Sequence, residues 1–378
     1  MKTTASQRGA ILIMVLWFIA IATVIVATLA SETRLSAQIV LYNKMGLQTW
    51  NDSLQALHAA QMELLINRQP PPAGEEELKP LSERKDQKYR FDGQVLELAY
   101  PVPNTVKVRI YDHAGKISIP RLTKQRLRQL LEKRIGQNPD KISALVDSWD
   151  DWLDLDDLKQ VNGAEKDYYE TLPTPYEPRN SEKIETVEEF LLIKGFDEVF
   201  NGVNMDSAFT VYGKKLYRVN PNFATREALM LLPGLDSASV DIILKKRRKK
   251  ELKFHDLNEF IEPEQLAQLR AWINLSSPSS NIYTIALQAN PEALEKSETE
   301  EENDQEVEPE EAEEESAKPP PQPENQGAYM VTVQYRGYNH LPKILMVNPY
   351  GVLPDTRHEQ ISSDDEDDED DWRLNTSF

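Results

Sequence analysis

The pattern of apolar and polar positions begins with an unbroken apolar run. Residues 10–30 (AILIMVLWFIAIATVIVATLA) carry no charge. At a rise of about 1.5 Å per residue, a helix of this length crosses a hydrocarbon core of about 30 Å. Lys2 and Arg8 precede the run, so the positive-inside rule places the N-terminus in the cytoplasm. The sequence therefore predicts a single-pass membrane anchor, with the remaining chain on the opposite side.

A helical pattern continues beyond this apolar run. Apolar side chains recur every three to four residues from Leu35 to Leu65, separated by polar residues. Proline first occurs at Pro70, within a Pro- and Gly-rich segment that ends a helix. We expect one helix from Ile11 to Asn67 within residues 10–69. Its second half is amphipathic and should therefore pack on a folded domain.

The remaining chain alternates between strand and helix patterns. Strand patterns occur in the first part of a sheet (residues 89–119) at 94–100, 105–111 and 117–119, and return within residues 281–350 at 281–288, 328–335 and 343–347. Helical patterns fill residues 120–280, at 123–134, 141–153, 186–193, 222–232, 237–250, 256–261 and 263–273. The predicted fold class is α+β: a long N-terminal helix packed on an antiparallel sheet, with a large, mostly helical insertion.

Charge and composition refine this organisation. The net charge is −20, and much of it comes from residues 292–315 and 364–371. Runs of like charge repel and remain solvated, so we expect a disordered acidic and Pro-rich loop at 291–326 and an acidic tail at 351–378. The loop would join two strands of the same sheet. The chain has no cysteine, which excludes disulfides, thiolate metal sites and thiol nucleophiles.

The densest group of carboxylates is a candidate calcium site. Residues 147–157 (DSWDDWLDLDD) are followed by residues 163–169 (GAEKDYY). Side chains that alternate along an extended loop can point at one centre, and Ca²⁺ takes six to eight oxygen ligands. The candidate ligands are Asp154, Asp156, Asp157, Glu165 and Asp167. A solvated acidic loop that caps helices explains the spacing equally well, and a carboxylate pair for glycoside cleavage is a weaker alternative.

A second constellation is a candidate nucleic-acid patch. Residues 229–236 (LMLLPGLD) resemble a helix-hairpin-helix turn, whose backbone N–H groups can hold a phosphate. A basic run follows it and could neutralise phosphates. The patch comprises Pro233, Gly234, Lys245, Lys246, Arg247, Arg248, Lys249 and Lys250. The predicted anchor places this patch outside the cytoplasm, so a packing module, or a basic face that docks on an acidic partner, is favoured.

Several of these features together resemble one family. A short basic leader that ends in Gly9, directly before an apolar helix, resembles the leader of type IV pilin-like proteins, which a prepilin peptidase cuts before the residue that is Ala10 here. A plain single-pass anchor is the alternative. Together with residues 151–157, 163–169 and 187–195 (VEEFLLIKG), the leader and helix resemble the K-type minor pseudopilins of type II secretion systems. The resemblance covers nearly the whole chain.

This resemblance carries implications for fold, ligands and partners. It implies a pilin-like fold after a leader at residues 1–9, an anchor in the inner membrane and a periplasmic domain without enzymatic activity. It also implies Ca²⁺ held by acidic residues of the insertion. The implied partners are the I- and J-type minor pseudopilins, the other pseudopilins of the filament, the inner-membrane assembly platform and the prepilin peptidase.

One position bears on the place of the subunit in a filament. Most pilin-like proteins carry Glu at the fifth mature position, where it compensates the charged N-terminus of a neighbouring subunit. A charge in hydrocarbon is costly unless it is paired. Here that position is Met14, which favours the tip of the pseudopilus.

The alternative function for the whole chain is that of a membrane-anchored DNA-binding protein of competence type.

Overall fold

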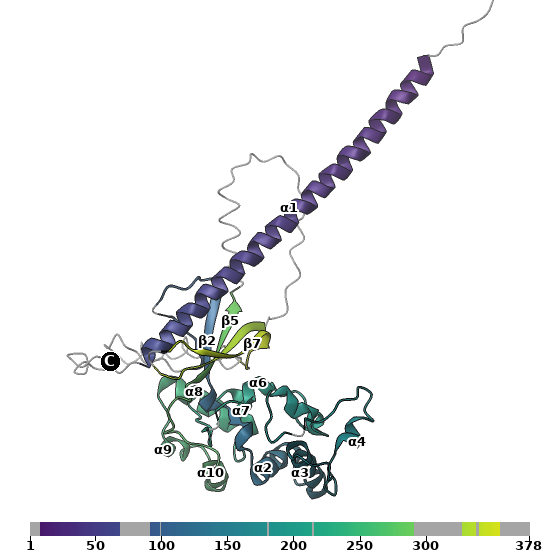
Figure 1. The fold of residues 1–378 in the computed structure, drawn as a ribbon. Coiled ribbons are helices and arrows are strands. Elements are labelled where there is room, and N and C mark those ends of the chain that lie inside the picture. Colours follow the sequence, from purple (N-terminus) through teal and green to yellow (C-terminus); the bar gives the residue numbers. More distant parts are fainter. Residues whose placement is uncertain are drawn as a thin grey trace, which may run out of the picture.

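The structure is a computed structural model that describes residues 8–68, 91–98, 100–179, 181–213, 215–290, 327–337 and 340–355. It has three parts: a long helix, a five-stranded sheet and a helical region (Figure 1). The sheet lies between the helical region and the C-terminal half of the long helix, whose N-terminal half extends away from the sheet (Figure 1). This arrangement confirms the predicted fold class.

Helix α1 (Arg8–Asn67) is continuous over 60 residues and includes both predicted cleavage residues, Gly9 and Ala10. Within it, Ile13–Val40 is apolar and long enough to cross a membrane, and none of that span is buried in the protein. In the last four turns one face of the helix is covered by the protein, and Ala56, Ala60 and Leu64 are fully buried there. The small alanine side chains allow the helix to approach the sheet closely.

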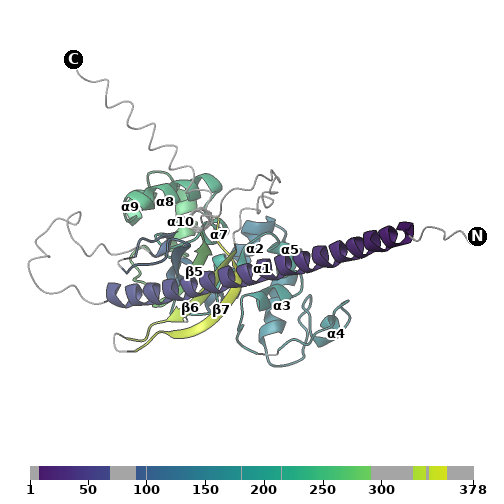
Figure 2. The ribbon, with the colours of Figure 1, turned by 90° about the horizontal axis from the view of Figure 1, so that it is seen from above.

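The sheet has the strand order β1-β2-β5-β6-β7, and each pair is antiparallel. The strands are β1 (Asp92–Val95), β2 (Val106–Asp112), β5 (Ile282–Ala289), β6 (Gly327–Gln334) and β7 (Lys343–Val352). In the centre, Ile110 pairs with Ile285 and Ile285 with Val331, and these side chains form one core with α1. Seen from above, α1 crosses over the sheet (Figure 2).

Strands β5 and β6 are direct neighbours, so the strands on both sides of the acidic run do share a sheet. The acidic loop predicted at 291–326 lies outside the described residues. Of the tail predicted at 351–378, only residues up to Asp355 are described. The final strand, β7, is longer than the predicted run 343–347 and forms one edge of the sheet.

The helical region is an insertion between β2 and β5. Its helices are η3 (His113–Gly115), η4 (Ile119–Arg121), α2 (Lys124–Ile135), α3 (Pro139–Leu153), α4 (Lys166–Tyr169), η5 (Glu188–Leu192), α5 (Phe196–Val199), α6 (Met205–Ala208), α7 (Arg226–Leu231), α8 (Ser237–Lys249), α9 (Phe254–Leu257) and α10 (Pro263–Arg270). They enclose a core of their own, in which Trp152, Phe190 and Trp272 are almost fully buried. Residues 186–193 contain a short 3₁₀ helix, η5, where a longer helix was expected.

Two strand assignments differ from the sequence pattern. Residues 117–119 do not join the main sheet, because β3 (Ile117–Ser118) pairs in parallel with β4 (Phe209–Thr210) inside the insertion. Strand β1 begins and ends earlier than the predicted run 94–100. An irregular register in β1 and the prolines after Tyr100 interrupt the pairing that the alternating side chains indicate.

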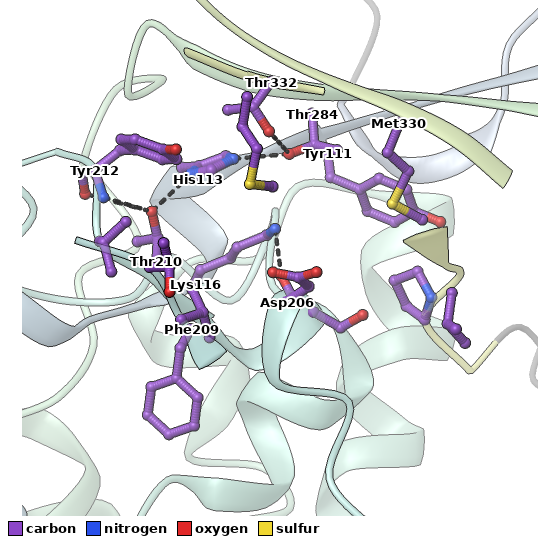
Figure 3. Close-up of a pocket in the computed structure, with 17 residues that line it drawn as sticks. Tyr111, His113, Lys116, Asp206, Phe209, Thr210, Tyr212, Thr284, Met330 and Thr332 are labelled. Carbon is purple, nitrogen blue, oxygen red and sulfur yellow. Dashed lines mark hydrogen bonds between the residues drawn. The ribbon is translucent and has the colours of Figure 1, made fainter. Parts of the chain in front are cut away.

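A buried polar junction joins the sheet to the insertion (Figure 3). His113 lies between two hydroxyls, with Nδ1 2.7 Å from Thr210 Oγ1 and Nε2 2.9 Å from Thr284 Oγ1. The Lys116 ammonium donates to the Asp206 carbonyl at 2.6 Å. Burial lowers the pKa of Lys116 to about 8 and that of His113 well below its usual value. The adjoining cavity, of about 30 Å³, holds little more than water.

Candidate metal centre

The candidate site is built where helix α3 ends. Asn138 accepts a hydrogen bond from the Lys141 N–H at 3.2 Å and caps the start of this helix. Its buried face carries Trp152 into the core, where the indole packs edge-on against Tyr169 at 5.2 Å. The same turn carries Asp151, whose side chain is fully buried, and the chain becomes extended at Asp154.

Three carboxylates converge at this point. One oxygen from each of Asp151, Asp154 and Glu165 lies within 4.8 Å of the other two. Glu165 comes from the start of α4 and is only 5 % exposed. Like charges this close repel strongly in a buried setting unless a proton or a cation compensates them. The geometry therefore defines a candidate cation site.

The loop between the two helices is held around this site. The Asp151 carboxylate accepts the Gln160 N–H at 3.0 Å, and Gly163 passes so close that an added Cβ would lie 1.8 Å from Asp151 Oδ2. Lys194 donates to the Gly163 carbonyl at 3.2 Å and lies 4.9 Å from the centroid of the Tyr168 ring. A side chain at Gly163 would displace the Asp151 carboxylate, so the loop and the acidic group depend on each other.

The oxygens at this site are incompletely satisfied. Among the described residues, both Glu165 oxygens and Asp154 Oδ1 are buried without a hydrogen-bond partner. Glu165 occupies the N-cap position of α4, yet its carboxylate does not cap that helix. Buried acceptors without partners are rare in native proteins, and here they face further carboxylates. These carboxylate oxygens suit a hard cation such as Ca²⁺, which prefers oxygen ligands and can bind a carboxylate through both oxygens.

Electrostatics agree with this geometry. Burial, followed by the carboxylates of Asp151 and Asp154, raises the pKa of Glu165 to about 7. Burial also raises the pKa of Asp154 and Asp151, with further contributions from neighbouring carboxylates. Without a cation, the site would hold a proton on Glu165 near neutral pH. A bound cation would replace that proton, because metal ligands must be ionised.

The structure brings together only part of the predicted ligand set. Asp154 and Glu165 are in the group, whereas Asp156 is exposed and accepts the Leu158 N–H at 2.9 Å. Asp157 and Asp167 are exposed and lie outside the group. Sequence reasoning missed Asp151. The spacing could have identified it: Asp151 lies three residues before Asp154, and residues three apart lie on the same face of a helix.

Part of the second predicted patch is packed inside the insertion. Gly234 adopts a φ of 85°, and an added Cβ would lie 2.3 Å from the Gln265 carbonyl of α10, so the hairpin turn is packed inside the insertion. Arg247 is only 3 % exposed and donates to the Pro221 carbonyl at 2.9 Å. Lys246 pairs with Glu259, and Lys250 pairs with Asp256 at 3.4 Å. Pro233 is also buried. The exposed members of the run are Lys245, Lys249 and Lys250.

Comparison with known proteins bears on the same part of the chain. Residues 112–200 match the family described as type II secretion system (T2SS), protein K. Type II secretion system protein K of Pectobacterium carotovorum subsp. carotovorum is 33 % identical over 69 residues, which are 18 % of this chain and 21 % of that protein. The chain therefore matches about a fifth of the length of this relative.

Among solved structures, the GspK-GspI-GspJ complex from the type 2 secretion system of enterotoxigenic Escherichia coli contains a similar chain. The TM-score is 0.45 at 13 % sequence identity, over 81 % of this chain and 97 % of that one.

In class, this is an α+β protein with a long, apolar N-terminal helix, and residues 112–200 match a family of secretion-system proteins that is not one of enzymes. More particularly, residues 112–200 carry the domain of type II secretion system protein K, which confirms the resemblance to the K-type minor pseudopilins. Asp151, Asp154 and Glu165 all lie within the matched residues.

Proposed function

We propose that this chain is a minor pseudopilin that caps the tip of a periplasmic pseudopilus and helps to initiate its assembly for protein export. The observation that carries the proposal is the match of residues 112–200, because those residues form the first half of the insertion that distinguishes this chain from a bare helix and sheet. Helix α1 also supports the proposal, because an apolar helix of this length could lie in the inner membrane before assembly and pack into the filament afterwards.

The arrangement of the three parts supports a terminal position. The insertion lies on the far side of the sheet from α1, so it projects beyond the part of the molecule that would pack along a filament (Figure 1). A subunit stacked above would meet this bulk. In this proposal the I- and J-type minor pseudopilins bind the chain from below, after prepilin peptidase has cut between Gly9 and Ala10 at the assembly platform.

We further propose that Asp151, Asp154 and Glu165 hold Ca²⁺. Three carboxylates offer up to six oxygens, which approaches the number that Ca²⁺ requires before any backbone carbonyl or water is added. Bound there, the cation would supply positive charge that ties the end of α3 to the start of α4. Its role is structural, because it would fix the loop 154–165 on the surface of the insertion.

Co-purification tests the assembly proposal. The full chain, carrying an affinity tag and extracted from membranes in mild detergent, is expected to retain co-expressed I- and J-type pseudopilins at equal stoichiometry. An unrelated single-pass protein with the same tag is the control. Recovery of neither partner would contradict the proposal. Salt-sensitive DNA binding in a gel-shift assay would instead support the competence-type alternative.

Met14 provides the test of tip position. Its side chain is 73 % exposed on α1 and so is available to a neighbouring subunit in a helix bundle. Met14→Glu is expected to allow incorporation along the shaft, because the carboxylate can compensate the N-terminal charge of the next subunit. Immunogold labelling of isolated filaments measures this, with Met14→Gln as an uncharged control. Equal shaft labelling of wild type and both variants would contradict tip specification by this residue.

A further inference from the structure

Helix α8 carries a basic stripe on its exposed side. Lys245 and Lys249 are exposed and one turn apart, and Arg248, between them in sequence, is half-buried. We call these three residues the α8 stripe. Cations near the C-terminal end of a helix interact favourably with the helix dipole, which accounts for basic residues in the last turn. That effect does not require them to continue along one exposed face, which makes the α8 stripe a candidate docking surface for an acidic segment.

The chain leaves the described residues beside this stripe. Asp355 is the last of them; its N–H donates to Glu227 Oε1 at 2.7 Å, and its carboxylate lies 3.8 Å from the Arg226 guanidinium. Arg226 also pairs with Asp241 of α8. Asp241 lies one turn before Lys245 on the same side of the helix. The exit point of the C-terminal segment and the α8 stripe are therefore linked through one arginine.

The segment that follows has matching charge. Residues 364–371 (DDEDDEDD) are eight consecutive carboxylates. Eight residues lie between Asp355 and Asp364, and nine steps along an extended chain span about 30 Å. The helix rises only about 12 Å from Asp241 to Lys249. The acidic run can therefore lie along the α8 stripe without strain, and its attachment to the same chain gives it an effective concentration of about millimolar.

We propose that the acidic tail of this chain, residues 364–371, docks on the α8 stripe of the same molecule. Docking would cover the exposed cations in the C-terminal half of α8, which lie outside the candidate metal centre and helix α1. The tail would compete there with any other polyanion, nucleic acid included. The interaction would weaken with salt, because exposed ion pairs are screened over about 8 Å at physiological ionic strength.

Zero-length cross-linking of the full chain tests this proposal. A carbodiimide joins carboxylates to amines that are already in contact, and mass spectrometry of the digest identifies the joined peptides. We expect residues 364–371 to be linked to Lys245 and Lys249, and the yield to fall several-fold when salt is raised from 0.05 to about 0.5 M. Two exposed lysines elsewhere, Lys183 and Lys343, should give no such links.

Variants separate the possible outcomes. Replacing Lys245 and Lys249 with alanine should reduce the remaining links to Lys250 several-fold, whereas the matched double replacement of Lys183 and Lys343 should not. Mixing isotopically heavy and light chains distinguishes docking within one molecule from docking between two. Links from residues 292–315 in place of the tail, links between chains, an even spread over all lysines, or no tail links at all would each overturn the proposal.

Discussion

Removal of Ca²⁺ with EDTA is expected to lower the melting temperature of the full chain by about 4 to 8 °C. Extracellular calcium modules bind at about 10⁻⁴ to 10⁻³ M, so saturating millimolar Ca²⁺ stabilises the folded state by about 2 kcal/mol. For a domain of this size each kcal/mol corresponds to about 2 to 4 °C. Differential scanning fluorimetry with EDTA, and then with excess Ca²⁺, measures both the loss and its recovery.

Two variants assign the effect to the three-carboxylate group. Glu165→Gln removes the most buried charge among the unpartnered oxygens and should abolish the response to Ca²⁺. Asp167→Asn removes one charge from the same region, but Asp167 is exposed and lies outside the group, so its response should match wild type. A calcium response that survives Glu165→Gln, or the lack of any response in wild type, would contradict the proposed site.

The pH dependence follows from the raised pKa of Glu165. In the folded, calcium-free chain the pKa of Glu165 is about 7, whereas the ordinary value for a Glu side chain is 4.5. The folded state therefore favours the protonated carboxyl. This contribution to stability is complete below pH 4.5 and is lost as pH rises through 7. Ca²⁺ requires the ionised form, so its stabilising effect should grow between pH 5.5 and 8. A calcium effect independent of pH over this range would argue against Glu165 as a ligand.

Arg247→Ala is expected to destabilise the fold by about 3 to 5 kcal/mol, because it breaks a buried ion pair and leaves its partner uncompensated. The guanidinium is 3.8 Å from the Asp92 carboxylate of β1, and the two side chains are 4 % and 1 % exposed. It also donates to the carbonyls of Pro221 and Ala224. This one side chain thereby fastens α8 to both the sheet and the loop before α7. Chemical denaturation of the full chain measures the loss.

Lys249→Ala is the matched control for this prediction. Lys249 belongs to the same basic run but is exposed at the end of α8, so its replacement should change stability by less than about 0.5 kcal/mol. If Arg247 instead served a nucleic-acid surface, Arg247→Ala would leave stability unchanged. Equal stability of the two variants would therefore contradict the structural role of Arg247.

Much of the fold follows from local patterns. The unbroken apolar run and the absence of proline before Pro70 predict a continuous helix, and α1 runs from Arg8 to Asn67. The alternation at 105–111 and 281–288 matches β2 and β5 closely, because both strands lie in the centre of the sheet. Strand β1 was harder to place, since an edge strand with an irregular register loses the pairing that its alternation suggests.

The candidate metal centre was predictable in place but not in composition. The density of carboxylates between residues 147 and 167 identified the region, and Asp154 and Glu165 lie in the group. Sequence spacing could not rank the other acidic residues, because an extended loop can turn any of them inward or outward. Burial of Asp151 beside Gly163 depends on how the loop folds back on α3.

The sequence by itself determined the long apolar helix, the α+β class and the acidic region, because each depends on composition or on a short-range period. Only the tertiary structure decided which carboxylates meet and which cations are buried. Asp151 and Glu165 are 14 residues apart in sequence and meet only across a folded loop, and Arg247 meets Asp92 only because α8 packs against the sheet. Contacts between distant segments depend on the packing of the whole chain, which no local pattern records.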